Sequence, residues 1–335
     1  GPIPPELGSM SNLEALDLAN TQLSGPIPVE LGDMPNLGNL SLGSDQLTGS
    51  IPPELGNLSN LRSLSLSGDL LTGSIPPELG NLSNLQSLHL YITQLEGPIP
   101  PELGSLSNLR YLEIDNTQLT GSIPAEFGNL SSLQALHLTS NQLSGQIPAE
   151  LGNLANLLSL RLNSNQLTGS IPANLGTLPN LNGLFLDFNQ LGGLFPIEVA
   201  RFGGTIGNFC DATENAGLYM PDTEEYRATD IGGVGYICGL AFTNNTETVT
   251  EDLAEEVEDL IAEEVLNSGH GNALTVKLDQ ATARAMRGQY RVAINLANAF
   301  INQLNELVTK GLLTPEEAAP LLERAEILIE LWSSM

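Results

Sequence analysis

The sequence has few of the residues from which binding and catalytic sites are usually built. Aromatic residues make up 4% of the 335 positions, and 11 Lys and Arg stand against 39 Asp and Glu, which gives a formal net charge of -28. The phosphate backbones of nucleic acids and anionic membrane surfaces repel such a chain. We therefore expect no nucleic acid among its partners, and we attribute the acidity, which is spread over the whole chain, to solubility.

Long apolar runs and the motifs of common enzyme families are missing as well. No apolar run reaches the roughly 18 residues of a membrane-spanning helix. The sequence contains no GxSxG, GxxxxGK[ST] or HExxH motif, and no cysteine with a nearby histidine. We therefore expect a protein that is not an enzyme, has no cofactor and no metal, does not insert into a membrane and exists as a monomer.

Cysteine is also scarce, since Cys210 and Cys238 are the only two in the chain. A disulfide between them would close a loop of about 28 residues and stabilise the fold by roughly 3 to 4 kcal/mol in the chain-entropy model. Two buried thiols are the alternative. We favour the disulfide.

A repeat of 24 residues fills the first part of the chain. Its opening glycine recurs at Gly1, Gly25, Gly49, Gly73, Gly97, Gly121, Gly145 and Gly169. Units of 20 to 29 residues with leucines at LxxLxLxx spacing are typical of leucine-rich repeats, in which each repeat supplies one short strand. Residues 1–193 are therefore predicted to form a right-handed α/β leucine-rich repeat solenoid with a parallel sheet on its concave face.

The motif inside each repeat resembles that of a known group of extracellular proteins. It reads LxGxIPxxLGxL and occupies, in the third repeat, Leu47, Gly49, Ile51, Pro52, Leu55, Gly56 and Leu58. This is similar to the plant-type leucine-rich repeats of receptor-kinase ectodomains and polygalacturonase-inhibiting proteins. The resemblance implies a protein that binds peptides, hormones or glycan-active enzymes through residues that vary between repeats.

Two columns of each repeat are expected to serve the structure. Leucines at the first, fourth and sixth strand positions, such as Leu85, Leu88 and Leu90, should point inward, and the residues between them outward. A column of short polar side chains that can hydrogen-bond the turning backbone follows the strands. This column consists of Thr21, Asp45, Asp69, Thr93, Thr117, Asn141, Asn165 and Asn189.

The outward strand positions differ between the two ends of the repeat region. The first three repeats place small polar residues there, whereas repeats four to eight gather aromatic and charged ones. These are His89, Tyr91, Tyr111, Glu113, Asp115, His137, Arg161, Phe185 and Phe188. Because aromatic residues and arginine are over-represented among binding hot spots, we predict that these residues bind a protein or glycan ligand. The alternative is that they are tolerated surface positions.

One triplet within this set raises the question of a metal site. His89, Glu113 and His137 occupy the same column on three adjacent strands, which suggests a zinc site with an open position. The two outer strands, however, lie about 9.6 Å apart, so both rings would have to lean inward to share an ion. We therefore expect a hydrogen-bonded ladder or a ligand contact, and no metal.

Rows of amides and hydroxyls form a further repeated feature. The amide row consists of Gln22, Gln46, Gln94, Gln118, Gln142, Gln166 and Gln190, with Leu70 in the third position. The hydroxyl row consists of Ser24, Thr48, Thr72, Thr120, Ser144 and Thr168. Such rows could match a repetitive surface such as ice or a polysaccharide, but closing the turns of the repeat is the simpler explanation.

The chain changes character after the eighth repeat. A ninth repeat begins at Gly193 and then loses its leucine spacing, so residues 194–245 are predicted to form an irregular cap that the disulfide closes. The segment from Asp230 to Cys238 looks like a degraded calcium loop, but a single aspartate does not make a calcium site.

Residues 246–335 are predicted to form a separate all-α domain. An acidic amphipathic helix should begin near residue 251 and end at Gly269 and Gly271. Further helices are expected at about 273–286, 289–309 and 315–332. Thr314 should cap the last one, with Glu317 completing a capping box.

This C-terminal part resembles the FIMAH domain, a helical module of secreted bacterial proteins. The similarity lies in GQYRVAINLANAFINQL, residues 288–304, and in GLLTPEEA, residues 311–318. It implies a secreted or cell-surface bacterial protein. Because a solenoid needs a polar terminal cap and the sequence starts inside a repeat, we also expect that a native leader and N-terminal cap have been removed. We therefore expect an extracellular binding module with its site on the concave face of repeats four to eight. The alternative is a structural or adhesive spacer that presents the C-terminal domain.

Overall fold

The computed structural model describes most of the chain, which divides into two compact units. The first comprises Gly1–Gly192, Pro196–Gly217 and Thr229–Leu240, and the second comprises Gly193–Phe195, Leu218–Ala228 and Ala241–Met335. The described residues are 1–43, 46–68, 70–203, 209–215, 217–219, 236–238, 240–241, 253–254, 257–258, 260–261, 265–285, 287 and 289–333. Asp45, Asp69 and residues 230–235 of the segment that looks like a degraded calcium loop lie outside them.

The first unit is built from one local structure that follows from the Gly-x-Ile-Pro motif. In the third repeat Gly49 adopts a φ of +80°, a conformation that glycine enters without steric cost. Pro52 then holds φ at -65° ahead of the 3-10 helix η3 (Pro53–Asn57). A Cβ on Gly56 would lie 2.4 Å from the Glu78 carbonyl oxygen, so glycine is needed for neighbouring 3-10 helices to stack.

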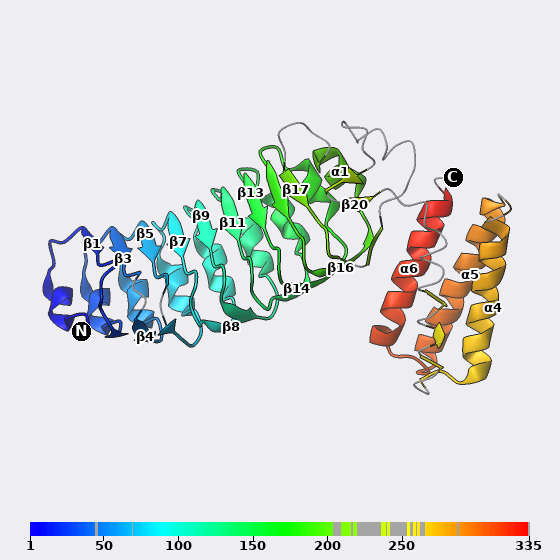
Figure 1. Ribbon diagram of the computed structural model, residues 1–335, viewed down its shortest axis with the longest axis horizontal. Helices are drawn as coiled ribbons and strands as arrows, with labels where there is room; N and C mark the ends of the chain where they lie inside the picture. Colours follow the sequence, from blue (N-terminus) through cyan, green and yellow to red (C-terminus); the bar gives the residue numbers. More distant parts are fainter. Residues whose placement is uncertain are drawn as a thin grey trace. The chain divides into compact units, whose positions relative to one another are not determined.

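The strands that alternate with these helices form a nine-stranded parallel sheet, which confirms the predicted solenoid (Figure 1). Successive strands pair without a register shift, because every repeat up to the eighth has the same length. In order they are β1 (Ala15–Asp17), β3 (Asn39–Ser41), β5 (Ser63–Ser65), β7 (Ser87–His89), β9 (Tyr111–Glu113), β11 (Ala135–His137), β13 (Ser159–Arg161), β15 (Gly183–Phe185) and β17 (Phe209–Asp211).

Two further sets of short elements complete the repeats. The remaining 3-10 helices are η1 (Pro5–Ser9), η2 (Val29–Asp33), η4 (Pro77–Asn81), η5 (Pro101–Ser105), η6 (Ala125–Asn129), η7 (Ala149–Asn153) and η8 (Ala173–Thr177). The strands that follow the concave sheet in each repeat are β2 (Gly25–Pro26), β4 (Leu47–Gly49), β6 (Leu70–Leu71), β8 (Glu96–Pro98), β10 (Gln118–Thr120), β12 (Ser144–Gln146), β14 (Gln166–Gly169) and β16 (Gln190–Leu194).

The core of the solenoid consists of the leucine columns. Leu85, Leu88 and Leu90 are fully buried, as their spacing predicts, and the equivalent leucines of the neighbouring repeats are buried as well. The side chains between them reach the surface. This strict alternation fixes which residues each repeat offers to a ligand.

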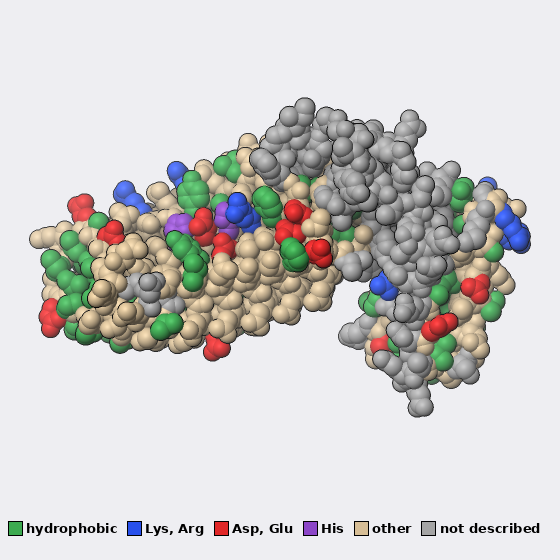
Figure 2. Space-filling view, in the orientation of Figure 1, with side chains coloured by type: hydrophobic (Ala, Val, Ile, Leu, Met, Phe, Trp, Pro, Cys, Tyr) green, Lys and Arg blue, Asp and Glu red, His purple; other side chains and the backbone are tan. Residues whose placement is uncertain are grey.

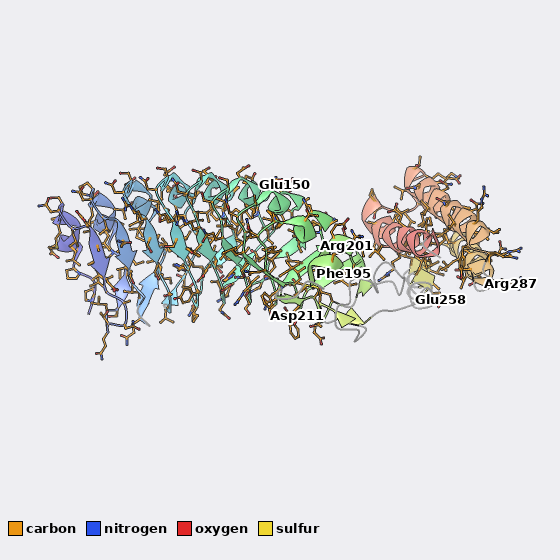
Figure 3. All side chains as sticks on the ribbon, turned by 90° about the horizontal axis from the view of Figure 1, so that it is seen from above. Glu150, Phe195, Arg201, Asp211, Glu258 and Arg287 are labelled. Carbon is orange, nitrogen blue, oxygen red and sulfur yellow. A yellow bond between two sulfur atoms is a disulfide. The ribbon has the colours of Figure 1, made fainter. Side chains whose placement is uncertain are left out.

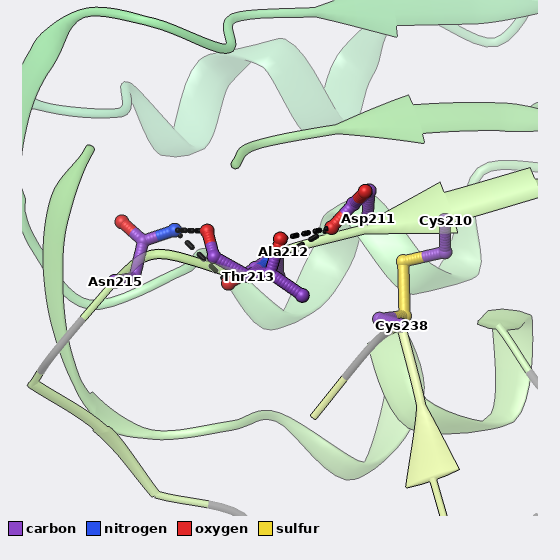
Figure 4. Close-up of a disulfide and its surroundings, with 6 residues drawn as sticks. All are labelled: Cys210, Asp211, Ala212, Thr213, Asn215 and Cys238. Carbon is purple, nitrogen blue, oxygen red and sulfur yellow. Dashed lines mark hydrogen bonds between the residues drawn. A yellow bond between two sulfur atoms is a disulfide. The ribbon is translucent and has the colours of Figure 1, made fainter. Parts of the chain in front are cut away.

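The ninth repeat keeps more of the repeat structure than its sequence indicates. Helix α1 (Ile197–Gly203) takes the place of a 3-10 helix, and β17 pairs with β15 in the parallel sheet. The predicted disulfide between Cys210 and Cys238 is present, with the two Cα atoms 4.6 Å apart (Figure 4). The Ala212 N–H donates to the Cys238 carbonyl at 3.0 Å, so Cys238 supplies the acceptor that a tenth strand would provide.

Short strands follow in the cap, at β18 (Gly217–Tyr219), β19 (Tyr236–Ile237) and β20 (Leu240–Ala241). The long helices of the second unit are α4 (Ser268–Ala285), α5 (Tyr290–Thr309) and α6 (Pro315–Ser333). The bounds of α5 and α6 are close to the predicted ones, whereas α4 begins about five residues before its predicted start. The predicted capping box is confirmed, because the Thr314 N–H donates to Glu317 at 2.7 Å and the Glu317 N–H donates back to Thr314 at 3.2 Å. Among the described helices, none has the length and apolar character needed to span a bilayer.

One helix boundary was predicted wrongly. Gly269 and Gly271 were expected to end the preceding helix, but both lie in the first turn of α4. The reason is the side chain of Asn267, whose Oδ1 accepts the His270 backbone N–H at 2.9 Å. An asparagine in this position satisfies a free N–H of the first turn, and this favours a helix start over a helix end.

Candidate functional site

The in-register sheet brings the central column of predicted site residues together. Paired strands set His89 beside Glu113, Glu113 beside His137, and His137 beside Arg161. Arg161 in turn pairs with Phe185 on β15. Figure 2 shows histidine, acidic and arginine side chains gathered over these strands, on a solenoid surface that is otherwise mostly uncharged.

Glu113 links the two histidines of this column. Its Oε2 lies 3.0 Å from His89 Nδ1, and its Oε1 lies 3.7 Å from His137 Nδ1. His137 Nε2 is 3.1 Å from the Ser159 hydroxyl, so both ring nitrogens of His137 have partners. Within the triplet, Glu113 is thus hydrogen-bonded to His89 and lies at ion-pair distance from His137. Among the described residues, no group of three His, Cys, Asp or Glu side chains has an arrangement suited to a metal ion.

Burial shifts the pKa of two members of the site. The pKa of His137 is lowered, chiefly because the ring is buried and also because Arg161 is near, and this outweighs Glu113 and Asp115. The pKa of Asp115 is raised by burial, although its Oδ1 accepts the Thr139 N–H at 2.6 Å. His137 is thus neutral at pH 7 and takes part as a hydrogen-bonding group.

The aromatic and cationic side chains are held by neighbours and still exposed. The Tyr111 hydroxyl donates to Gln134 Oε1 at 3.0 Å, and 41% of Tyr111 remains accessible. The Arg161 guanidinium lies 5.2 Å from the Phe185 ring centroid, within the range of a cation–π contact. Side chains that are already held in place lose less conformational entropy when a ligand binds.

The remaining predicted residues lie in the next two columns, where the chain leaves the strands. The ring of Tyr91 meets that of His89 edge-on at a centroid distance of 6.3 Å. Asp115 lies one repeat further along and is half-buried. Phe188 is four repeats beyond Ile92 and is 57% exposed.

Two residues of this surface were missing from the predicted set. Ile92 follows Tyr91 and is 60% exposed. Asp211 extends the central column beyond Phe185, because β17 continues the sheet. Figure 3 places Asp211 on the sheet side of the solenoid and Glu150 on the opposite side.

A weak sequence signal marks the strand that carries Asp211. In the segment FCDATEN, residues 209–215, Cys210 and Ala212 stand where Leu184 and Leu186 stand in the repeat before. Asn215 takes the place of the asparagine in the structural column and donates to the Leu186 carbonyl at 3.0 Å. Small residues in place of leucine, and an interval longer than 24, conceal this repeat from a search for leucine spacing.

The rows of amides and hydroxyls lie on a separate side of the solenoid. All the described glutamines of the amide row are exposed, as is Leu70 in their midst. The Ser and Thr hydroxyls two residues further on are exposed or half-buried. Glu96 is the one charged residue at the positions of these two rows. Figure 2 shows this side as a broad uncharged band below the acidic and basic side chains.

Models of three known families match separate parts of the chain. Residues 97–189 match the leucine-rich repeat region family, and residues 12–34 and 60–82 match the leucine-rich repeat family. Residues 250–330 match the FIMAH domain. No curated protein matches the chain.

Several solved structures are similar to the repeat unit. The leucine-rich repeat ectodomain of the plant receptor kinase GASSHO1/SCHENGEN3 from Arabidopsis thaliana, in complex with CASPARIAN STRIP INTEGRITY FACTOR 2, is 44% identical with a TM-score of 0.63. The match covers 68% of this chain and 27% of the receptor chain. The plant peptide hormone receptor RGFR1, in complex with RGF2, is 36% identical, and 37% of it is covered. The chain thus spans about a third of the length of these receptor chains.

Two similar structures come from other kinds of protein. A plant ice-binding protein is 29% identical with a TM-score of 0.55, over 67% of this chain and 70% of that one. The Leptospira interrogans leucine-rich repeat protein LIC12759 is 32% identical with a TM-score of 0.54, over 68% of this chain and 55% of that one.

Proposed function

We propose that this chain, a leucine-rich repeat protein with a C-terminal FIMAH domain, is a non-catalytic extracellular module that binds a polypeptide on the concave face of repeats four to eight. One observation carries the proposal. Adjacent strands from β7 to β15 present aromatic, cationic and anionic side chains in one continuous column, whereas β3 and β5 present small polar ones.

The contacts within the column support a binding role. Glu113 orients two histidines, and Phe185 lies beside the Arg161 guanidinium, so the surface is organised before any ligand arrives. Side chains of both charges suit a polypeptide, which offers amides, charges and apolar groups together. The similar receptors from plants, in complex with CASPARIAN STRIP INTEGRITY FACTOR 2 and RGF2, favour a polypeptide over a glycan.

The location follows from related observations. The disulfide between Cys210 and Cys238 is of the kind that persists in oxidising compartments. The similar ectodomains and the FIMAH match are consistent with a secreted or cell-surface protein, and we place its origin in bacteria. In this view the helical domain is an accessory to the binding unit.

A peptide library displayed on phage, together with a glycan array, tests this function. We expect the full chain to enrich peptides and the variant with Tyr91, Tyr111, Arg161 and Phe185 replaced by Ala to lose them. A control with Ser63 and Ser65 replaced by Ala, on β5 of the same sheet, should keep them. If glycans are bound and no peptide is enriched, the ligand of this surface is a glycan and the proposed polypeptide ligand is wrong. No ligand in either format would support a spacer.

The uncharged side of the solenoid favours a second candidate, contact with a repetitive surface such as ice or a polysaccharide. Its amide and hydroxyl rows recur about every 4.8 Å, with Glu96 as the one charge, in a chain of net charge -28. The similarity to a plant ice-binding protein points the same way. An assay of ice recrystallisation tests this candidate. Inhibition by the wild-type chain that is lost in Thr120→Arg and kept in Arg161→Ala would support it. If the wild-type chain does not inhibit recrystallisation, the proposal that it binds ice is wrong.

A further inference from the structure

At the turn that follows the strand, every repeat whose turn is described places one residue in the left-handed backbone region, in addition to the glycine that opens the repeat. Three of these eight positions hold glycine or asparagine, which enter this region readily, and three hold serine or glutamate. The other two, Ile92 and Phe188, hold large apolar residues. The positions and φ values are Asn20 (55°), Gly68 (72°), Ile92 (57°), Asn116 (56°), Ser140 (55°), Ser164 (58°), Phe188 (54°) and Glu214 (56°).

The solenoid imposes this conformation regardless of the side chain. From Asn20 to Phe188, the N–H of each such residue donates to a carbonyl of the next repeat, for example from Ile92 to Asp115 at 3.0 Å and from Phe188 to Thr213 at 3.1 Å. Asn116 makes the same bond to Thr139 at 2.9 Å. A residue placed here must accept a positive φ or lose a bond between repeats.

Ile92 and Phe188 are therefore unfavourable for the fold in two ways. Positive φ is a genuine outlier for β-branched and bulky residues, and it costs free energy. Burial does not compensate, because the two side chains are 60% and 57% exposed, the highest values among the large apolar residues described. Asparagine, which Asn20 and Asn116 provide at this position, would lower the backbone cost and, as a polar residue, avoid the cost of exposure. A role in binding accounts for the presence of large apolar residues at these two positions.

The spacing between the two residues suits an extended peptide. They are four repeats apart, or about 19 Å at the spacing of parallel strands. An extended chain advances about 3.3 Å per residue, and alternate side chains share a face. Six residues therefore cover about 20 Å and return a side chain to the same face.

The charges along this distance indicate what lies between the peptide's apolar residues. Asp115 and Asp187 flank the line from Ile92 to Phe188, Glu113 lies in the adjoining column, and Asp211 is one repeat beyond. Arg161 is the one Lys or Arg at these outward positions. The surface between the two apolar residues is thus acidic and attracts a cationic segment.

We propose that Ile92 and Phe188 are paired anchors for an extended peptide that carries apolar side chains at positions i and i+6 with Lys or Arg between them. This rests on the proposed polypeptide-binding function and adds the ligand's spacing and charge. It also assigns a binding role to Ile92.

The test uses the full chain, a library of 12-residue peptides on phage and a synthetic copy of the most enriched peptide. Ile92→Asn and Phe188→Asn should each weaken binding of that peptide at least tenfold while leaving the urea unfolding midpoint unchanged or higher. Ser140→Asn, at the same turn between the two anchors, should change neither. The enriched peptides should share two apolar residues six positions apart, with a basic residue between.

The outcomes separate the two proposals. Peptides that are enriched and bind both Asn variants as tightly as wild type, but lose affinity in Arg161→Ala, would overturn the anchors and retain the binding function. Asn variants that unfold at lower urea concentration would also overturn the anchors, since the apolar residues would then serve the fold. If no peptide is enriched, the polypeptide-binding function itself is wrong.

Discussion

Replacing Asn165 by Ala tests how strongly the asparagine column holds the solenoid together. The Asn165 amide is buried, with its Nδ2 donating to the Leu138 and Leu162 carbonyls at 2.8 and 3.0 Å. Its Oδ1 accepts the Leu143 N–H at 3.0 Å. Alanine leaves the Leu143 N–H without a partner in the interior, whereas the Leu138 and Leu162 carbonyls still accept from Asn141 at 3.2 Å and from Asn189 at 3.0 Å. An unpaired buried group costs about 1 to 3 kcal/mol, so we expect a loss of roughly 2 to 3 kcal/mol.

The chain offers a matched control in Asn156. It belongs to a second column of asparagines, on the exposed side, and its single amide bond reaches the Ser131 carbonyl at 2.8 Å. Asn156→Ala removes the same atoms, but water can replace the lost partner, so we expect a loss of about 0.5 to 1 kcal/mol.

Urea unfolding followed by circular dichroism measures both variants against wild type. Similar slopes with a lower midpoint for Asn165→Ala would support the reasoning, because the slope reports the surface exposed on unfolding. Equal losses for the two variants would refute it. In that case burial of the bonded backbone groups would not decide the energetic role of an asparagine in this fold.

Four further predictions concern stability. Thr93 is buried in the same column and its hydroxyl has no partner in the described structure, so Thr93→Asn should raise the free energy of unfolding by about 1 kcal/mol in urea titrations. Because the pKa of His137 is lowered in the folded state, the unfolded state binds a proton at this residue more readily, and the free energy of unfolding should fall as the pH drops below 6.5. The contribution of His137 to this pH dependence should be absent in His137→Gln. The raised pKa of Asp115 has the opposite effect, because the folded state binds the proton more readily and the ionised carboxylate lowers the free energy of unfolding above about pH 4. Asp115→Asn should therefore be more stable than wild type at pH 7 and equally stable at pH 3. Reduction of the disulfide between Cys210 and Cys238 should cost about 3 to 4 kcal/mol, seen as a lower unfolding midpoint with a reductant, and an unchanged midpoint would contradict it.

The sequence predicted the solenoid and its surface columns well, because its repeat length is constant. A period of 24 with strict alternation assigns Leu88 to the core and His89 and Tyr111 to the surface, and parallel pairing adds no register shift. The bounds of the helices from residue 289 onward followed from the position of Thr314 and from apolar periodicity.

What the sequence did not reveal depends on distances and dihedral angles. Strand β17 stayed hidden because Cys210 and Ala212 replace leucines, so Asp211 was not assigned to the site. The cost of Ile92 became visible only with its φ of 57° and its exposure. The bond from Asn267 to His270, which starts α4, competes with two glycines that favour a helix end in the sequence.

The disulfide in the last repeat also has a mechanical consequence. Cys210 and Cys238 are 28 positions apart in the sequence. A pulling force along the chain passes between them through the sulfur–sulfur bond, so the segment that they enclose bears no tension. That segment would otherwise lengthen the pulled chain by about 90 Å. Oxidation therefore shortens the extensible length of the molecule at the point where the repeats end. A single-molecule stretching experiment would record the difference as an added step of that length after reduction.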